Sequence, residues 1–383
     1  MSGPSGAGVR DRLLLLGERP LEIPYGAFRL HIAVDPAGGR PALALSCGDL
    51  GGTQPLLARV HSSCVTSESY GGCDCDCVEQ LALALETIAR EGRGVVFYLL
   101  QEGRGAGFFA KVRDRMIVQA SGNRKSTFDA YAELGLPPDL RSYEDVGNLA
   151  DLIGIEAPLC LLTNNPEKAE GVASSAGIGV SGIRRIEGDA SPWNRDYLAA
   201  KSRSGHGLAE PTALTSAELP GVVENEIPSL LAGAPRFLRI ASYWLPVRDP
   251  AAGGAHFFRL YAYADLVESC ERVVLDFDDG HGRVPLLALQ AESLLGRFPG
   301  SGDEGGWSQT CAAILAQGSG LAAFVMAEGF DASLHERPGA PEPAAELLAA
   351  HAAANGRLVG GTQPREVREA LLRSQPQGGP VRV

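Results

Sequence analysis

The sequence contains no hydrophobic run long enough to cross a membrane. Its longest leucine run, RLLLLG at residues 12–17, is much shorter than the roughly 18 apolar residues that a membrane-spanning helix needs. The same run is too short and too poorly flanked to be a secretory signal. The 383 residues are sufficient for two domains, each with its own hydrophobic core. We therefore expect a cytoplasmic protein of two domains with no membrane partner.

The sequence also lacks an excess of positive charge. It has 34 lysine and arginine residues against 46 aspartate and glutamate residues, which gives a net charge of −12. Proteins that bind nucleic acids gain much of their affinity from basic side chains that displace counterions from phosphates. We therefore expect no nucleic-acid partner, and any phosphate ligand must be held by a local group of basic residues.

Cysteine is scarce outside one short segment. Four of the eight cysteines are Cys64, Cys73, Cys75 and Cys77. In a cytoplasmic protein, clustered cysteines are more often metal ligands or catalytic groups than disulfides. The other four are interpreted as small buried hydrophobic residues. They are Cys47, Cys160, Cys270 and Cys311.

The spacing of the clustered cysteines fits a zinc site. A loop supplies Cys64, and Cys75 and Cys77 form a close pair just before a predicted helix. Three thiolates leave the fourth position of a tetrahedral zinc to water, whose pKa the metal lowers toward neutrality. Cys73 offers a second possible pair, so spacing alone leaves the choice of three ligands open. A redox dithiol and a purely structural metal site are the alternatives.

Strand and helix patterns alternate along the first half of the chain. Short apolar or alternating runs predict strands at 28–34 and 41–46. Helical spacing predicts a helix over 78–91 that ends at Gly92, and an apolar strand follows at 95–100. Later predicted elements are helices at 110–120, 126–135, 145–154 and 167–177, and a strand within 158–166. This order predicts an α/β fold in which helices flank a mixed α+β sheet.

Composition divides the chain into four parts. Residues 1–20 indicate a flexible tail, and the segment 209–237, rich in Pro, Ala, Ser and Glu, indicates a linker. Between them, 21–208 forms the predicted α/β domain. The remaining part, 238–383, contains no cysteine cluster but repeats fragments of the first domain.

The repeated fragments occur in the same order in both halves. FRL at 28–30 recurs at 258–260, and PLLA at 55–58 recurs at 285–288 with the same spacing. EGRGVVFYLLQEG is later echoed by QGSGLAAFVMAEG. The polar residues are not repeated, because the positions of Arg59, His61 and Cys64 hold Leu289, Ala291 and Leu294. We therefore expect 238–383 to be a degenerate, non-catalytic copy of the first domain.

Five motifs occur in the order that is typical of one known family: RVHSSC, CDC, QEGRGAG, DLRSY and LLTNNPEK. On these motifs, residues 21–208 resemble the GTP cyclohydrolase II family. The resemblance implies a cyclohydrolase II-like fold, and the repeated fragments indicate that this fold is tandem and pseudo-duplicated. It also implies zinc-dependent hydrolysis of GTP that opens the imidazole ring, removes C8 as formate and releases pyrophosphate, as in riboflavin biosynthesis. In this register Cys64, Cys75 and Cys77 are the zinc ligands, and Cys73 is surplus.

The same resemblance implies how the nucleotide is held. Arg141, with Asp139 beside it, is expected to attack the α-phosphorus and form a covalent guanylyl adduct. Glu102 is expected to accept hydrogen bonds from guanine, and Mg²⁺ is expected on the substrate phosphates. The implied substrate-binding residues are Arg59, Gln80, Glu102, Arg104, Thr127, Thr163 and Lys168. Among these residues, the arginines and the lysine supply local positive charge for the triphosphate.

One family residue is replaced in this sequence. The family pattern Lys-x-Arg-x-Tyr is KVRDR here, so Arg115 stands where the family has a tyrosine associated with catalysis. Arg115 is therefore a candidate catalytic residue. The product is then either the usual diaminopyrimidine or a formamidopyrimidine ribonucleotide, formed when deformylation fails. The alternatives are a related hydrolase acting on another purine or pyrimidine nucleotide, and a catalytically silent nucleotide-binding protein.

The second half has an expected role in assembly. Members of the family are homodimers, so a fused degenerate copy can occupy the place of the partner within one chain. We expect an intramolecular pseudo-dimer, with a homodimer as the alternative.

Overall fold

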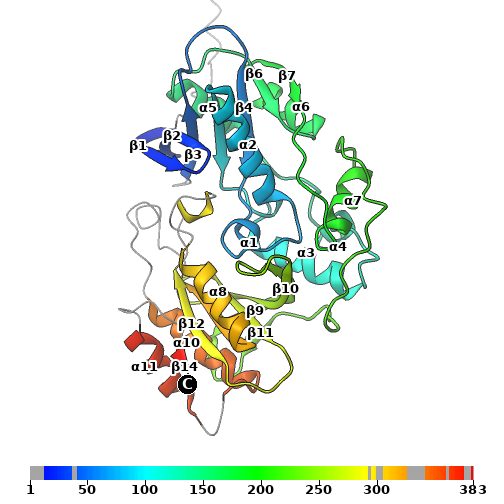
Figure 1. Cartoon of the computed structure of the whole chain (residues 1–383), viewed down its shortest axis with the longest axis vertical. Helices are drawn as coiled ribbons and strands as arrows, with labels where there is room; N and C mark the ends of the chain where they lie inside the picture. The colour runs from blue at the N-terminus through cyan, green and yellow to red at the C-terminus, as the bar shows by residue number, and fades with distance from the viewer. Residues whose placement is uncertain are drawn as a thin grey trace, which may run out of the picture. The chain divides into compact units, whose positions relative to one another are not determined.

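The computed structural model of the protein is shown in Figure 1. It describes residues 13–36, 41–291, 295–298, 305–325, 341–358, 362–374 and 381–382. These residues form two compact units, each built on a seven-stranded mixed sheet with helices. The predicted α/β class is therefore confirmed. Within the described ranges, no helix combines the length and the apolar character that a membrane crossing requires.

The first unit consists of the described residues up to 63, together with 82–100 and 142–187. Its strand order is β1-β2-β3-β5-β4-β6-β7. The strands are β1 (Leu14–Ile23), β2 (Gly26–Val34), β3 (Pro41–Cys47), β4 (Leu56–Ser62), β5 (Gly94–Leu99), β6 (Leu159–Leu162) and β7 (Val180–Arg184). The helices are α5 (Glu144–Leu152), α6 (Pro166–Ser175) and most of α2 (Cys77–Glu91). Neighbours from β1 to β5 are antiparallel, and those from β5 to β7 are parallel.

Local sequence explains the central elements of this unit. All six residues of β5 are buried, as its apolar run predicts, and Val95 and Phe97 share a core cluster with Val146 and Leu149 of α5. The helix predicted over 78–91 is observed as α2. It ends before Gly92, whose φ of 73° is one that glycine adopts without steric strain.

Strand β1 corrects the prediction of a flexible tail over 1–20. Residues 14–20 pair with β2 in antiparallel register, from Leu14 opposite Val34 to Pro20 opposite Arg29. Residues 1–12 lie outside the described ranges. The run of four leucines lacks the alternation of apolar and polar residues that marks a strand. The strand forms because this segment pairs with β2, which the local sequence pattern does not show.

The second unit consists of 64–81, 101–141 and the described residues from 188 onward. Its strands are β8 (Ser229–Leu231), β9 (Ala234–Arg248), β10 (Ala255–Asp265), β11 (Cys270–Asp278), β12 (Leu286–Ala291), β13 (Ser319–Val325) and β14 (Val381–Arg382). Its helices are α1 (Val65–Glu68), α3 (Phe108–Ala120), α4 (Thr127–Glu133), α7 (Arg195–Arg203), α8 (Gly305–Gln317), α10 (Pro341–Ala354) and α11 (Pro364–Ser374), with short 3₁₀ turns at Gly103–Gly105 and Leu295–Arg297. The predicted linker 209–237 therefore includes β8 and the start of β9.

The two sheets share a strand plan. The order β1-β2-β3-β5-β4 in the first sheet corresponds to β9-β10-β11-β13-β12 in the second, with the same parallel and antiparallel neighbours. The two FRL fragments lie on corresponding strands, β2 and β10. Each PLLA fragment starts one residue before its strand, which is β4 in the first sheet and β12 in the second. The register also agrees, because Leu30 pairs with Leu45 as Leu260 pairs with Leu275. The sheets differ at the next strand, since β6 is parallel to β4 but β14 is antiparallel to β12.

The compact units divide the chain at other places than the sequence repeat. Residues 64–81 and 101–141, from the first half, belong to the same unit as the second sheet. The predicted boundaries, 21–208 and 238–383, describe repeated sequence rather than contacts, and they stay a prediction.

Two buried tyrosines of the second sheet give a matched stability test. The hydroxyl of Tyr263 shares a 2.7 Å hydrogen bond with Nδ1 of His351, whereas that of Tyr243 has no hydrogen-bond partner among the described residues. Tyr263→Phe is expected to lower the free energy of unfolding by about 1 kcal/mol, because a buried hydrogen bond is lost. Tyr243→Phe is expected to leave it unchanged or raise it. Urea unfolding measures both values, and an equal loss in the two variants would contradict the expectation.

Candidate metal centre and nucleotide site

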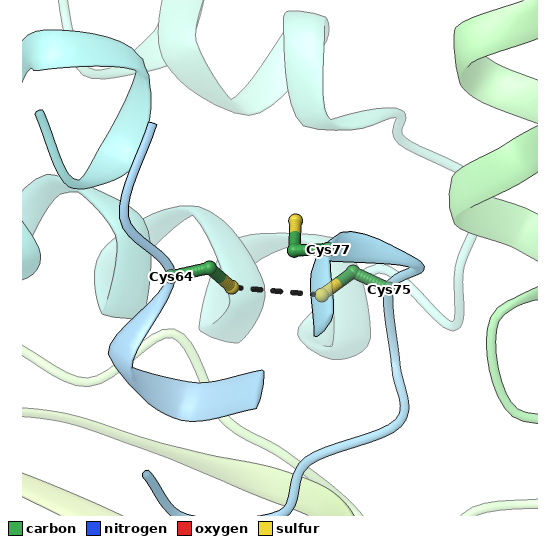
Figure 2. A group of neighbouring side chains, drawn as sticks. All are labelled: Cys64, Cys75 and Cys77. Carbon is green, nitrogen blue, oxygen red and sulfur yellow. Dashed lines mark hydrogen bonds between the residues drawn. The ribbon is translucent and has the colours of Figure 1, made fainter. Parts of the chain in front are cut away.

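Three cysteines of the second unit converge on one point. Cys64 directly precedes α1, Cys75 lies in the following loop, and Cys77 is the first residue of α2. Their sulfur atoms all lie within 4.8 Å of one another. Figure 2 shows Cys64 and Cys75 facing each other, with Cys77 beside them, and the first two sulfurs are 3.6 Å apart. The N-terminus of α2 carries partial positive charge, which favours thiolates at this position.

The donor set suits a zinc ion. Thiolates bind zinc at about 2.3 Å in tetrahedral geometry, which places their sulfurs slightly less than 4 Å apart. The 3.6 Å between the sulfurs of Cys64 and Cys75 agrees with that spacing and is far longer than the roughly 2 Å of a disulfide bond. Hydrogen bonds from Cys75 and Cys77 and the charge of Lys111 lower the pKa of Cys64 well below its usual range. These residues therefore fit the metal that the sequence motif implies.

Cys73 is not part of the group formed by the other three sulfurs. Its Sγ lies 3.4 Å from the carbonyl oxygen of Pro246, to which the thiol donates a hydrogen bond. Burial, together with the charge of Asp74, raises the pKa of Cys73 to about 12, so its thiol stays protonated at neutral pH. The ambiguity left by sequence spacing is thus reduced, because Cys73 lies outside the group that can share a metal.

Lys111 links the cysteines to the QEGRG segment. Its ammonium donates hydrogen bonds to Sγ of Cys64 at 3.1 Å and to Oε1 of Glu102 at 2.7 Å. The other oxygen of Glu102 accepts from the amide of Val65 at 2.7 Å. Burial alone would lower the pKa of Lys111, but the charges of Cys64 and Glu102 raise it well above its usual range. A permanent cation therefore lies beside the three sulfurs.

Arg115 occupies a buried polar position. Its Nε lies 3.2 Å from Oδ2 of Asp74, the residue before Cys75, and both side chains are only 12% exposed. Its guanidinium also lies 4.7 Å from the ring centroid of Tyr197 on α7. Burial raises the pKa of Tyr197 to about 12. The position of the missing family tyrosine thus holds a cation that pairs with Asp74 and packs on another phenol.

Gln80 and its surroundings form a separate network near the start of α2. Gln80 donates to Oδ2 of Asp76 at 2.5 Å, and Lys201 of α7 donates to the other oxygen at 2.6 Å. Burial opposes ionisation of Asp76, but Lys201 holds its pKa below the usual value. This ion pair ties α7 to the segment that carries Cys75 and Cys77.

The DLRSY segment lies against the QEGRG segment. Nε of Arg141 donates to both oxygens of Asp139, at 2.9 and 3.1 Å, and the amide of Leu140 donates to the carbonyl of Arg104 at 2.9 Å. Burial opposes ionisation of Asp139, yet its hydrogen bonds with Arg141 lower its pKa. Arg104 has a left-handed backbone (φ 54°) and places its guanidinium 4.1 Å from the ring centroid of Phe128. A left-handed arginine is uncommon, and such conformations are frequent at functional sites.

Three of the predicted substrate residues, Arg59, Thr163 and Lys168, lie in the first unit. Arg59 on β4 donates to the carbonyl of Leu162 at 2.8 Å, and Lys168 of α6 donates to that of Val60 at 3.1 Å. Thr163 follows β6 directly. Since β4 and β6 are parallel neighbours, these three side chains lie near the C-terminal ends of the strands, where α/β sheets bind ligands.

Several polar residues of the site have no role assigned by the sequence. Lys111 lies within the KVRDR motif, but its spacing from other residues predicts no chemical role. Tyr197 and Lys201 are brought to the cysteine segment, and Arg115 to Asp74 within it, by packing between elements far apart in the chain. A buried charge pair leaves no periodic signal, so sequence patterns alone do not identify these contacts.

Asp114 provides a test of pH dependence. Burial raises its pKa to about 6, although the charge of Arg115 lowers it, and its Oδ2 accepts a 2.8 Å hydrogen bond from Thr127. The unfolded chain has a pKa near 4, so the folded state binds this proton more tightly. That contribution to stability is complete below about pH 4 and is lost as the pH rises through 6.

Asp114→Asn is therefore expected to flatten the pH dependence of the free energy of unfolding between pH 4 and 6. Relative to wild type, the variant should gain up to about 3 kcal/mol over this range. Urea unfolding at several pH values measures the difference, and parallel curves for the two proteins would contradict the expectation.

Comparison with known proteins agrees with these motifs. A sequence model described as GTP cyclohydrolase II matches residues 15–185. The GTP cyclohydrolase-2 of Pseudomonas putida (strain F1) is 38% identical over 189 residues, which cover 49% of this chain and 90% of that protein. The chain belongs to the GTP cyclohydrolase II family. The GTP cyclohydrolase-2 of Shewanella loihica is 34% identical over 193 residues, covering 50% of this chain and 91% of that protein.

Membership of the GTP cyclohydrolase II family confirms the resemblance drawn from the motifs of the first half. A solved structure of a two-domain 3,4-dihydroxy-2-butanone 4-phosphate synthase from A. baumannii is 15% identical. The match covers 47% of this chain and 42% of the solved chain. Its TM-score of 0.27 is too low for a comparison of folds.

Proposed function

We propose that this protein is a zinc-dependent hydrolase of GTP that opens the guanine imidazole ring at C8 and releases pyrophosphate. The observation that carries the proposal is the convergence of the sulfurs of Cys64, Cys75 and Cys77 within 4.8 Å, in a chain of the GTP cyclohydrolase II family. When bound there, zinc supplies a Lewis acid and lowers the pKa of the water that it binds.

The residues around the sulfurs support the ring-opening role. Lys111 stays charged beside Cys64 and offsets part of the negative charge of three thiolates. Glu102 is held by Lys111 and by the amide of Val65, and a carboxylate has about four lone-pair sites. Oε1 also accepts from the amide of Gly103 at 3.2 Å, so one site remains for a hydrogen bond from N1–H or the exocyclic amine of guanine.

Arg141 and Asp139 are proposed to release pyrophosphate. A guanidinium is a poor nucleophile while it is protonated. Asp139 accepts hydrogen bonds from Arg141 and is positioned to take the proton that the guanidinium must lose. The bond from Arg141 nitrogen to the α-phosphorus forms as the bond from that phosphorus to pyrophosphate breaks. Hydrolysis of the adduct regenerates Arg141.

Positive charge for the triphosphate is proposed to come from Arg59, Arg104 and Lys168, with Mg²⁺ bound to the phosphate oxygens. Gln80, Thr127 and Thr163 are proposed as further contacts with the substrate. Gln80 and Thr127 also bond to Asp76 and Asp114. Their hydroxyl and amide groups can both donate and accept, which leaves capacity for a ligand.

The replacement of the family tyrosine by Arg115 affects which product of GTP we expect. No phenol is present at this position, and Arg115 is paired with Asp74. We therefore propose that ring opening is completed but that deformylation is slow, which gives a formamidopyrimidine ribonucleotide rather than a diaminopyrimidine. Action on another purine or pyrimidine nucleotide is the second candidate, which the same replacement favours. A catalytically silent nucleotide-binding protein is the third.

Residues 238–383 are proposed to be a degenerate copy of 21–208. The shared order of five strands and the common register of β2–β3 and β10–β11 support this proposal. The copy is proposed to take the place of a second subunit in a cytoplasmic, intramolecular pseudo-dimer. A solution mass near 40.1 kDa supports the pseudo-dimer, whereas a mass of twice that value indicates a homodimer.

The test is to incubate the zinc-loaded protein with GTP and Mg²⁺, identify the products by mass spectrometry, and assay formate and pyrophosphate. Pyrophosphate together with a retained formyl group is the expected result. Formate equal to pyrophosphate would contradict the proposed product but not the proposed enzyme class. Unchanged GTP would contradict the proposed substrate, and a panel of other nucleotides would then separate the second and third candidates.

A further inference from the structure

The segment between Cys64 and Cys75 extends the second sheet. The amide of Cys73 donates to the carbonyl of Pro246 at 2.9 Å, and the amide of Arg248 donates to the carbonyl of Gly71 at 2.9 Å. Pro246 and Arg248 belong to β9. One edge of β9 faces the cysteine loop at this point, and its other edge pairs with β10. The C-terminal end of β9 therefore has the cysteine loop as its second backbone neighbour.

The close approach depends on Gly72, which forms an isolated bridge with Val247. A Cβ atom at Gly72 would lie 2.6 Å from the carbonyl oxygen of Thr66 and 2.7 Å from Cδ1 of Leu245. Both distances are shorter than any normal contact of a Cβ atom. The loop is thus shaped to fit against β9 and α1 at the same time.

Aromatic residues of the second half hold the same loop from another side. Nε1 of Trp307, on α8, donates to the carbonyl of Tyr70 at 3.0 Å. The rings of Tyr70 and Phe324 of β13 have centroids 4.2 Å apart, and those of Trp307 and Phe324 are 5.2 Å apart. Tyr70 is completely buried. The loop is therefore anchored by one side chain whose burial depends on α8 and β13.

Helix α3 is fixed to the same strand. The side chain of Gln119 donates to the carbonyl of Trp244 at 2.7 Å and accepts from its amide at 2.8 Å. Val112 and Met116 of α3 share a core cluster with Tyr243 of β9. Lys111, which bonds to Cys64, lies on this helix. The cysteine loop and the helix that carries its cation are thus both supported by β9.

We propose that the second half positions the metal centre: β9, with Trp307 and Phe324, holds the loop 70–73 so that Cys75 and Cys77 meet Cys64. The inference rests on the proposed zinc site. It gives the half that lies outside the Cys64, Cys75 and Cys77 motif a role in the affinity of that site, through residues that do not touch the metal. Loss of such outer contacts typically lowers metal affinity by about 10- to 100-fold.

The test uses two tryptophans that make the same type of contact. Nε1 of Trp307 donates to Tyr70 in the loop, and Nε1 of Trp244 donates to the carbonyl of Gly221, outside it, also at 3.0 Å. Full-length Trp307→Phe and Trp244→Phe each lose one indole donor and keep an aromatic ring. Zinc affinity is measured by competition with a chromogenic chelator. Trp307→Phe is expected to bind zinc about 10-fold more weakly, and Trp244→Phe is expected to match wild type.

A second pair of variants guards against misfolding of the first. Arg248→Pro removes the amide that donates to Gly71, whereas Arg248→Ala keeps that amide, and both variants lose the ion pair of the Arg248 side chain with Glu79 of α2. Weaker zinc binding in Arg248→Pro than in Arg248→Ala, with unchanged circular dichroism, supports the proposal. Wild-type zinc affinity in both Trp307→Phe and Arg248→Pro would overturn it. Failure of the wild type to bind zinc would instead contradict the proposed zinc enzyme, and the positioning role with it.

Discussion

Replacement of Cys75 by serine is expected to remove zinc and to abolish turnover of GTP. Its sulfur lies 3.6 Å from that of Cys64, and serine offers a much weaker zinc ligand than a thiolate. Loss of a direct ligand should exceed the roughly 100-fold upper range seen for outer contacts. Zinc content is measured by atomic emission, and turnover by release of pyrophosphate.

Cys73→Ser is the matched control for this prediction. Cys73 lies two residues away, is also buried, and directs its thiol to the carbonyl of Pro246. This variant is expected to keep one zinc per chain and near-normal turnover, since serine can donate the same hydrogen bond. Loss of zinc in Cys73→Ser with retention in Cys75→Ser would show that the other pair of cysteines binds the metal.

Replacement of Arg115 by methionine is expected to lower the free energy of unfolding by about 3 kcal/mol. The variant leaves Asp74 in a nearly buried position without its cation, and removal of one partner of a buried ion pair typically costs 3–5 kcal/mol. It also removes the cation above the ring of Tyr197. Urea unfolding measures the change.

Two further variants separate this effect from a general loss of charge. Arg203 pairs with Glu210 at 2.7 Å, but both side chains are well exposed, so Arg203→Met should cost less than about 1 kcal/mol. In the double variant Asp74→Asn with Arg115→Met, part of the lost stability should return because no unpaired charge is buried. A double variant that loses the sum of both single effects would contradict coupling between Asp74 and Arg115.

Local sequence patterns predict the elements whose burial is periodic. The helix over 78–91 differs from α2 by one residue at its start, and the strand over 95–100 is shifted by one residue from β5. Strand β1 was not predicted, because its formation depends on pairing with β2 and its outer leucines are exposed. Periodicity reports which face of an element is buried, and it is weak when that face is formed by a distant segment.

The candidate site also has a part that the sequence predicts and a part that depends on distant contacts. The cysteine motif and its family resemblance identify the three converging sulfurs, but the direction of Cys73 depends on Pro246, far along the chain. The bonds of Lys111 to Cys64 and Glu102 join three separate segments. Such contacts require the folded chain, since no spacing rule connects residues whose neighbours are set by packing between helices and sheets.

The anchoring of the cysteine loop on β9 also limits how this protein can be cut or recombined. A fragment ending in the segment 209–237 would retain all of the cysteine motif but would lose Trp307, Phe324 and β9. It would also expose Tyr70, Val112 and Met116, which are buried in the complete chain, and such an apolar patch promotes aggregation. The proline-rich segment is therefore a poor place for domain exchange.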